Sequence, residues 1–521
     1  MSKVYSEGRD LQERILSGVN KLADNVVSTL GPRGRNVIIH RKDKTPIITK
    51  DGVTVAEFVN FDDPFENVGA EIIKQVALET NTLAGDGTTT STVLARAILQ
   101  NAQKHIVAGA SPVEVKRGIE KALKRIVLNI KALSSMIETQ DSIEHVATVS
   151  SNGDKVIGEL VAMAVDKAGH NGSVSIEEAK SMDTSLNLVE GFSFQSGYFS
   201  SSFVNNERKH AVEYDDPLLF VTDIKIDNVQ EILPVLELAA REARPLVFIA
   251  EEVEGQALAA MIMNAVRGSM KVAAVKAPGY GQERRGTLKD ICVSTGANFF
   301  TRESAKKMKD VTLSDFGQAK KIEVLKNQTT IVGGHGDPDE VDKVIEALKQ
   351  EIKQTDDIRE CEMLQSRVTR LNSGVVEILV GGATEVEMIE KKHRIEDALE
   401  AVKSALEEGI VAGGGSALLR CGTLNLDEFE DDQLIGARIL LKSLEAPARQ
   451  MAKNAGESED LIINEILSSE ENHGWNFAQS KMVNMIDVGI IDPAKVTRVA
   501  LENAVSAAST LLTSGHAIVE K

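Results

Sequence analysis

Residues 246–275 read LVFIAEEVEGQALAAMIMNAVRGSMKVAAV, two short apolar runs separated by an apolar helical pattern. The runs 246–249 and 272–275 have the length of buried strands, and residues 256–267 place apolar side chains at helical spacing. A strand, a helix and a second strand in this order predict a β-α-β unit with parallel strands. The middle of the chain is therefore expected to form an α/β sheet with helices on its faces.

Two helices of this middle region are apolar over too much of their circumference. A helix at a protein surface needs one apolar stripe, yet residues 256–267 carry two and residues 229–240 carry a set of similar width. Either both helices are buried on two sides, which is the more common arrangement, or each exposes an apolar flank to a partner. The stripes of the first helix are Leu258, Met261, Ile262 and Ala265, and Ala259, Ile262, Met263 and Val266.

Both ends of the chain have a helical texture instead. Helices are expected over 11–30, 68–80, 88–100 and 112–133, a hairpin over 36–50, a charge-rich helix pair over 339–371, and a strand over 375–380 followed by long helices. The two helical ends could form one domain with the middle inserted, or the chain could fold as three domains in a row. Texture alone does not decide between these organisations.

Composition limits the classes of function. The 521 residues suggest three or four domains, and 59 basic against 78 acidic residues give a formal charge of −19. That acid excess disfavours nucleic acid and anionic membranes as partners, because phosphate affinity comes from lysine and arginine. Three widely spaced cysteines exclude a disulfide scaffold and suit a reducing compartment. The N-terminus has no apolar signal-peptide core and is expected to lead directly into a helix, so a cytoplasmic protein is predicted.

The segment GDGTTTST (85–92) is the first candidate for chemistry. Two glycines frame Asp86, and five hydroxyl residues then open an apolar-periodic helix. A helix N-terminus offers unpaired N–H groups that can hold phosphate oxygens, and Asp86 is placed to hold a magnesium ion. Taken by itself, however, the segment is more often a tight Asp-Gly turn with a threonine cap.

Three further glycine turns are ambiguous in the same way. The segments 29–34, 50–52 and 413–415 could each approach a ligand by their backbone. They could instead be, respectively, a helix C-cap, a turn and a flexible joint. Asp397 is expected in the first turn of a helix that begins near Arg394, where an acid also favours the helix dipole. The chain has no G-x-x-x-x-G-K-[ST], H-E-x-x-H or G-x-S-x-G motif, which excludes P-loop, zincin and nucleophile-elbow chemistry.

Taken together, these segments resemble the group I chaperonins, the GroEL family. The matching segments, in that family's order and spacing, are TLGPRGRNV (29–37), KDGVTVA (50–56), AGDGTTT (84–90), KAPGYG (276–281), VAGGG (411–415), and NMID (484–487) leading to DPAKV (492–496). The resemblance covers essentially the whole chain. It implies a mostly α fold with α/β content: a helical equatorial domain (1–132 and 409–521), a small intermediate domain (133–190 and 374–408) and an α/β apical domain (191–373).

The resemblance also implies an ATP site with Mg²⁺, and with K⁺ as a further ion. The phosphates would be held by Thr29, Leu30, Gly31, Pro32, Lys50, Asp86, Gly87, Thr88, Thr89 and Thr90, with Asp86 on magnesium. The adenosine would contact Gly414, Asn476, Phe477, Ala478 and Asp492. Asp51 and Asp397 would act as catalytic carboxylates near the attacking water, Asp397 arriving when the intermediate domain closes.

In the middle region the resemblance implies a groove for non-native polypeptides and for the mobile loop of a GroES-like co-chaperonin. Its residues would be Tyr198, Phe199, Phe203, Leu233, Leu236, Leu258, Ile262 and Met263. Such an apolar surface suits promiscuous binding, because apolar contact is non-directional. Gly191 and Gly374 would form the apical hinge, and Gly409 the lower hinge.

The sequence departs from the family pattern at several positions. Arg33 replaces a lysine and keeps its charge, Ser202 replaces a groove tyrosine, and Met136 replaces a hinge proline. Arg449 matches a residue of the contact between rings, but the acidic partner position holds Ser458. The resemblance implies a heptameric ring, and the departure at Ser458 leaves open whether that ring is single or double.

The preferred function is an ATP-hydrolysing folding machine that captures unfolded chains on the groove and releases them into a ring cavity. An acidic cavity wall would repel many acidic clients. Two alternatives belong to other classes: an ATP-using small-molecule enzyme such as a kinase, for which no acceptor motif is evident, and a chaperonin-like scaffold without turnover. The presence of Asp51 and Asp397 disfavours the scaffold.

Overall fold

The computed structural model describes residues 3–520 except 41–45, 138, 170–172, 180, 208, 302, 304–305, 356 and 373. The chain divides into two compact units: unit 1 is Met1–Ala162 with Gly382–Lys521, and unit 2 is Met163–Gly381. Unit 1 is thus built from both ends of the chain, and unit 2 is inserted between them. This is one of the two organisations left open by sequence texture. The finer five-segment, three-domain division stays a prediction.

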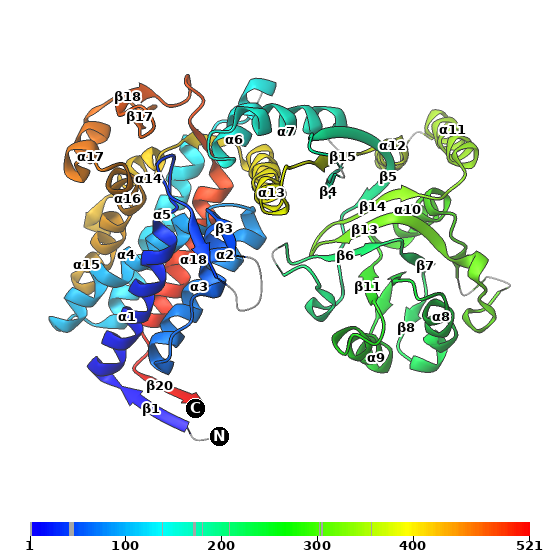
Figure 1. Cartoon of the computed structure of the whole chain (residues 1–521), viewed down its shortest axis with the longest axis horizontal. Helices are drawn as coiled ribbons and strands as arrows, with labels where there is room; N and C mark the ends of the chain where they lie inside the picture. The colour runs from blue at the N-terminus through cyan, green and yellow to red at the C-terminus, as the bar shows by residue number, and fades with distance from the viewer. Residues whose placement is uncertain are drawn as a thin grey trace. The chain divides into compact units, whose positions relative to one another are not determined.

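Unit 1 is a bundle of long helices. Figure 1 shows α1, α3, α4, α5 and α18 packed along one another. Helix α18 packs against α3, α4 and α5 and is apolar on several sides, because its alanines and valines let the neighbouring helices approach. The helices of this unit are α1 (Gly8–Val27), α2 (Gly52–Phe58), α3 (Pro64–Ala84), α4 (Thr88–Val107), α5 (Pro112–Leu133), α6 (Gln140–Ser150), α13 (Glu385–Glu408), α14 (Ser416–Arg420), α15 (Asp431–Ser443), α16 (Ala446–Ala455), α17 (Glu459–Ser468) and α18 (Ala494–Leu512), and α7 (Lys155–Ala168) begins in it.

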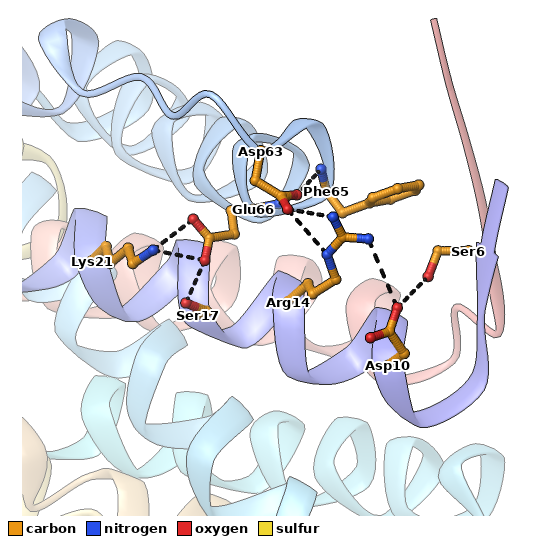
Figure 2. Close-up of polar contacts among 8 residues, drawn as sticks. All are labelled: Ser6, Asp10, Arg14, Ser17, Lys21, Asp63, Phe65 and Glu66. Carbon is orange, nitrogen blue, oxygen red and sulfur yellow. Dashed lines mark hydrogen bonds and ion pairs between the residues drawn. The ribbon is translucent and has the colours of Figure 1, made fainter. Parts of the chain in front are cut away.

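Polar contacts fix α1 against the start of α3 (Figure 2). Asp63 accepts hydrogen bonds from the backbone N–H groups of Phe65 and Glu66, at 2.9 and 3.1 Å, and so caps α3. The same carboxylate pairs with Arg14 of α1, while Glu66 accepts from Lys21. The two helices also approach closely: a Cβ at Gly18 would lie 1.9 Å from the carbonyl oxygen of Glu66. Glycine is therefore required at this crossing.

Unit 1 also contains short strand pairs. The predicted hairpin is confirmed as antiparallel β2 (Val37–Ile39) and β3 (Ile47–Thr49), although its charged turn, 41–45, lies outside the described residues. The expectation that the N-terminus leads directly into a helix is wrong, because β1 (Lys3–Glu7) precedes α1 and pairs with β20 (His516–Glu520). The other pairs are β16 (Ile410–Ala412) with β19 (Ile491–Pro493), and β17 (His473–Asn476) with β18 (Lys481–Asn484).

Unit 2 is built on a ten-stranded mixed sheet. The predicted β-α-β unit is confirmed: β9 (Leu246–Ala250), α9 (Gly255–Val266) and β11 (Val272–Lys276) follow one another, and β7 (Leu218–Thr222), β9 and β11 are parallel. The path β11-β9-β7-β13-β14-β5-β15-β4 continues through antiparallel neighbours to a parallel β15–β4 pair, with β12 on β7 and β6 on β13. The remaining strands are β4 (Ser173–Glu178), β5 (Ser185–Phe194), β6 (Val212–Asp215), β12 (Phe299–Phe300), β13 (Gly317–Val324), β14 (Thr329–Gly334) and β15 (Gly374–Val380), with β8 (Lys225–Ile226) and β10 (Glu252–Val253) in a separate pair.

Helices cover this sheet. Besides α9, they are α8 (Val229–Glu242), α10 (Gly281–Thr295), α11 (Pro338–Gln354) and α12 (Ile358–Asn372), and a short 3₁₀ turn, η1, spans Ser201–Phe203. The charge-rich pair predicted over 339–371 is confirmed as α11 and α12, which pack on each other (Figure 1). The core centres on Phe220, whose ring lies 5.5 Å from that of Phe248 and 4.9 Å from that of Phe300. Among the described residues, no helix combines the length and apolarity needed to cross a membrane.

Candidate functional site

A cavity of about 790 Å³ lies in unit 1, within the size range of small-molecule sites. All of the residues assigned above to ATP, to magnesium and to catalysis line it, although they come from seven separate segments of the chain. The structure therefore brings the phosphate, adenosine and catalytic candidates together at one place. The role of each residue in this cavity stays a prediction.

The segment around Asp86 joins α3 to α4. Gly87 has a φ of +86° and precedes the first turn of α4, whose free N–H groups belong to Thr88, Thr89 and Thr90. The carboxylate of Asp86 accepts hydrogen bonds from the N–H of Gly87 at 2.5 Å and from Ser150 Oγ at 3.0 Å. Burial raises the pKa of Asp86, and the charge of Asp51 adds to this rise.

Two neighbouring turns meet this segment. Thr29, just after α1, donates to the carbonyl oxygen of Val26 at 2.8 Å, and its hydroxyl lies 3.4 Å from that of Thr89. Gly52 allows the closest approach, because a Cβ there would lie 2.5 Å from Thr89 Oγ1. Gly52, which sequence analysis could not interpret by itself, is thus needed for the segment 50–52 to pack on the start of α4.

Asp51 is held rigidly at the N-terminus of α2. Its carboxylate accepts from the N–H groups of Val53 and Thr54, each at 3.1 Å, and from Thr54 Oγ1 at 2.6 Å. A capping aspartate fixed in this way presents its oxygens to the cavity in one orientation. The same residue is therefore both a structural cap and a candidate for positioning water.

Asp397 does not lie where the sequence pattern placed it. The helix that carries it, α13, begins at Glu385, so Asp397 is in the helix interior, and the expectation of a first-turn position is wrong. The pattern misled because 385–393 is strongly charged and lacks a clear apolar stripe. Away from the helix N-terminus, the dipole no longer explains an acid at this position. Asp397 lines the cavity together with Asp51 and Asp86.

The adenosine candidates also line the cavity and lie mainly on β17, the turn after it and β19. Asn476 ends β17 and accepts from the N–H groups of Ala478 and Gln479 through its side-chain oxygen, at 3.0 and 3.2 Å. Phe477 is buried in a cluster with Leu419 and Met451. Asp492, on β19, has its pKa raised to about 7 by burial and, secondarily, by the charge of Asp86.

These carboxylates fit a magnesium nucleotide as substrate. Asp86 and Asp492 both have raised pKa values because burial disfavours their charged forms, and a divalent cation would offset that cost. Within the described ranges, no three acidic, histidine or cysteine side chains gather as metal ligands. A magnesium ion here would therefore need phosphate oxygens as well as Asp86, which is the coordination that Mg²⁺ commonly takes.

Sequence analysis missed several residues at this cavity. Ser150 ends α6 and bonds to Asp86, but a serine at a helix end carries no sequence signal for such a role. Trp475 also lines the cavity, and its being the chain's single tryptophan is the one sequence signal that could have pointed to it. His145 and His393 also line the cavity, and no motif in the sequence marks either of them.

The predicted polypeptide-binding residues lie on unit 2, around α8, α9 and η1, and α9 contacts both of the others. Leu233 and Met263 are each 48% exposed, while Leu258, Ile262, Tyr198 and Phe199 are partly buried against the core. Phe203 and Leu236 are 2% and 8% exposed, so in this conformation they belong to the core, not to a surface. Of the two arrangements considered for these helices, the exposed apolar flank is the one present, and Val266 extends it.

The structure also shows where the predicted hinge glycines lie and what Arg449, the residue matched to the contact between rings, binds within its own chain. Gly191 lies inside β5, where a Cβ would lie 2.2 Å from Val375 Cγ2, and Gly374 begins the neighbouring β15. Gly409 ends α13 with a φ of +80°. Arg449 pairs with Glu445 and Asp460 of its own chain, each at 2.7 Å. Hinge motion and contacts between rings stay predictions.

Comparisons with known proteins agree on one family. A family model described as the TCP-1/cpn60 chaperonin family matches residues 22–521. Two crystal structures of the chaperonin gp146 from the bacteriophage EL 2 (Pseudomonas aeruginosa), obtained in the presence of ATP-BeFx, share the fold over 99% of both chains. Crystal form II gives a TM-score of 0.69 at 21% identity, and crystal form I gives 0.62 at 22%.

Proposed function

Because the chain belongs to the TCP-1/cpn60 chaperonin family, we propose that it is an ATP-hydrolysing chaperone that captures non-native polypeptides on unit 2 and releases them in response to nucleotide in unit 1. The chain has the chaperonin fold. Members of this family are ATPases that form oligomeric rings. The similar phage chaperonin was crystallised with an ATP analogue, which supports nucleotide binding in the proposal.

The observation that carries the proposal is the convergence of Asp51, Asp86 and Asp397 on one cavity. The N-terminus of α4 would bind phosphate oxygens through its N–H groups, and Lys50 would add positive charge beside them. Magnesium, held by Asp86 and the phosphates, would neutralise charge on the leaving phosphate. Asp51 and Asp397 would orient the attacking water and accept its proton.

The exposed flank of α8 and α9 would hold the client. Leu233, Met263 and Val266 present aliphatic and thioether side chains, and apolar contact of this kind tolerates many sequences. Nucleotide can drive release only if it binds more tightly to the conformation that hides this flank. The proposal also includes a homo-oligomeric ring of seven subunits, a GroES-like partner, bound K⁺ and a cytoplasmic location.

The test combines two assays on one preparation. Purified protein is given Mg-ATP, phosphate release is followed, and light scattering of a chemically denatured client is recorded in parallel. We expect steady hydrolysis that needs no small-molecule acceptor, together with suppressed aggregation. Hydrolysis that appears only with an added acceptor would instead favour a small-molecule kinase, and suppression without hydrolysis would favour a scaffold.

A further inference from the structure

We propose that Arg33, Ser480 and Glu457 are positioning residues that hold the two halves of the nucleotide site at a fixed spacing and so set nucleotide affinity. This inference rests on the proposed function, because it assigns the phosphates to one side of the cavity and the adenosine to the other. It concerns residues to which neither the motifs nor that function gives a role. Its basis is a continuous chain of hydrogen bonds behind the cavity.

The chain of bonds runs from the phosphate turn to the adenosine hairpin. Arg33 donates from Nη2 to Ser480 Oγ at 3.0 Å, and Ser480 in turn donates to one carboxylate oxygen of Glu457. The other oxygen of Glu457 accepts from Trp475 Nε1 at 2.6 Å. Both oxygens of this carboxylate are therefore used, one by β17 and one by the turn that joins β17 to β18.

Arg33 also contacts two backbone carbonyls. Its Nη1 donates to the carbonyl of Ala455, where α16 ends, at 3.3 Å, and its Nη2 reaches the carbonyl of Ala478 at 3.4 Å. Three segments that are distant in sequence thus meet on one guanidinium: 29–34, the end of α16 and the turn 477–480. A planar fork with several donors is suited to this task, and a lysine is not.

The hairpin turn is held in a conformation that needs support. Ser480 has a φ of +54°, a region that residues other than glycine rarely adopt. Its side chain is the link between Arg33 and Glu457, so the bonds that use it also restrain the turn. Asn476 caps the same turn from inside, through Ala478 and Gln479.

These residues act from outside the site. Gly31, Pro32, Trp475 and Asn476 line the cavity, whereas Arg33, Ser480 and Glu457 are not among the described residues that do. Their effect on nucleotide must therefore pass through the spacing of the two loops. A preformed site loses less free energy in ordering when ligand binds, so the network should change affinity and leave the hydrolytic step alone.

The experiment uses the whole protein and its single tryptophan. Fluorescence of Trp475 is titrated with Mg-ADP and Mg-ATP, and kcat and KM of ATP hydrolysis are measured separately. The variants are Glu457→Gln, which keeps the shape but loses one acceptor, and Ser480→Ala, which removes only an exposed hydroxyl. The matched control is Glu471→Gln, an exposed glutamate just before β17.

We expect Kd and KM to rise about five-fold in both variants, the effect of one ordinary hydrogen bond, with kcat unchanged. The control should match the wild type. Equal affinities in wild type, Glu457→Gln and Ser480→Ala would overturn the inference and leave the proposed function standing, as would a fall in kcat at unchanged KM. A wild type that binds neither nucleotide would overturn both.

Discussion

Asp86 and Asp492 line the same cavity, Asp86 from the turn before α4 and Asp492 from β19, and the charge of Asp86 disfavours ionisation of Asp492. Burial and the charge of Asp86 together raise the pKa of Asp492 to about 7. The two residues lie 406 positions apart in the chain, so their proximity is a product of the fold that joins both chain ends into unit 1. The charge of Asp86 thus adds to the cost that burial imposes on the ionised form of Asp492.

The first prediction concerns stability and pH. A carboxyl group whose pKa is raised on folding binds protons more tightly in the folded state, so its contribution to stability falls as pH rises from about 4 to about 7. Asp492→Asn removes this penalty. Relative to the wild type, the variant should therefore be more stable at pH 8 than at pH 5, by on the order of 2 kcal/mol.

Urea unfolding at the two pH values measures this difference. Asp487→Asn, which changes an exposed aspartate nearby, is the control and should show no such dependence. A stability difference between Asp492→Asn and wild type that is the same at pH 5 and pH 8 would contradict the assignment of the raised pKa.

The second prediction separates nucleotide binding from turnover. Asp397→Ala removes a carboxylate from the cavity wall without touching the turns that we propose to bind phosphate, so ATP affinity should stay near that of the wild type. Turnover should fall by about 10² or more, the usual effect of losing a general base. Glu396→Gln, next to it on α13, provides the control. Comparable hydrolysis by Asp397→Ala and wild type would refute the catalytic role.

The third prediction concerns client capture. Leu233→Ser should weaken binding of an unfolded polypeptide while ATP hydrolysis persists, because Leu233 is 48% exposed on α8. Leu258→Ser is a less clean test, since Leu258 packs against the core and its loss would also cost stability. Leu188→Ser, on β5 and 70% exposed, is the matched control. Equal aggregation suppression by the wild type, Leu233→Ser and Leu188→Ser would count against the flank of α8 and α9 as the capture surface.

The fourth prediction tests the contact between α1 and α3 in Figure 2. Although burial opposes it, hydrogen bonds from Arg14 and from the backbone of Glu66 and Phe65 hold the pKa of Asp63 below its usual value. Asp63→Ala loses a helix cap as well and should lower the free energy of unfolding by about 1–2 kcal/mol at pH 7.

The sign of the pH effect follows from the lowered pKa of Asp63. Its stabilisation is fully present above the unfolded-state pKa, near 4, and is lost as pH falls through the lower folded-state value. The difference between Asp63→Ala and wild type in urea unfolding should therefore shrink in acid. Asp10→Ala, which lies in the same cluster but is largely exposed, should have little effect at any pH. If Asp63→Ala lowers the free energy of unfolding at pH 7 by as little as Asp10→Ala does, the cap formed by Asp63 is unimportant.

Local patterns predicted local structure well. The helix expected over 112–133 has those bounds, and the β-α-β unit around 246–275 and the hairpin near 36–50 are present. Apolar periodicity and turn residues predict these elements, because both signals lie within a few positions of the element in the sequence. The full extent of α13 was missed because its first turns are charged and mostly solvent-facing.

Long-range pairings could not be predicted in this way. The strand pair β1–β20 joins residues more than 500 positions apart, and its alternating pattern is too short to stand out. The site shows the same limit. The glycine motifs indicated segments that line the cavity, but Ser150 beside Asp86 and Glu457 beside Trp475 are tertiary contacts between unrelated segments. No spacing rule connects such pairs.

The measurement that most directly tests the proposed coupling is the affinity of the protein for a labelled, chemically denatured polypeptide, with and without Mg-ATP. Nucleotide in the Asp86 cavity should weaken binding at the flank of α8 and α9 by about ten-fold, a typical coupling between two sites. Identical affinities in the two conditions, at saturating nucleotide, would contradict it.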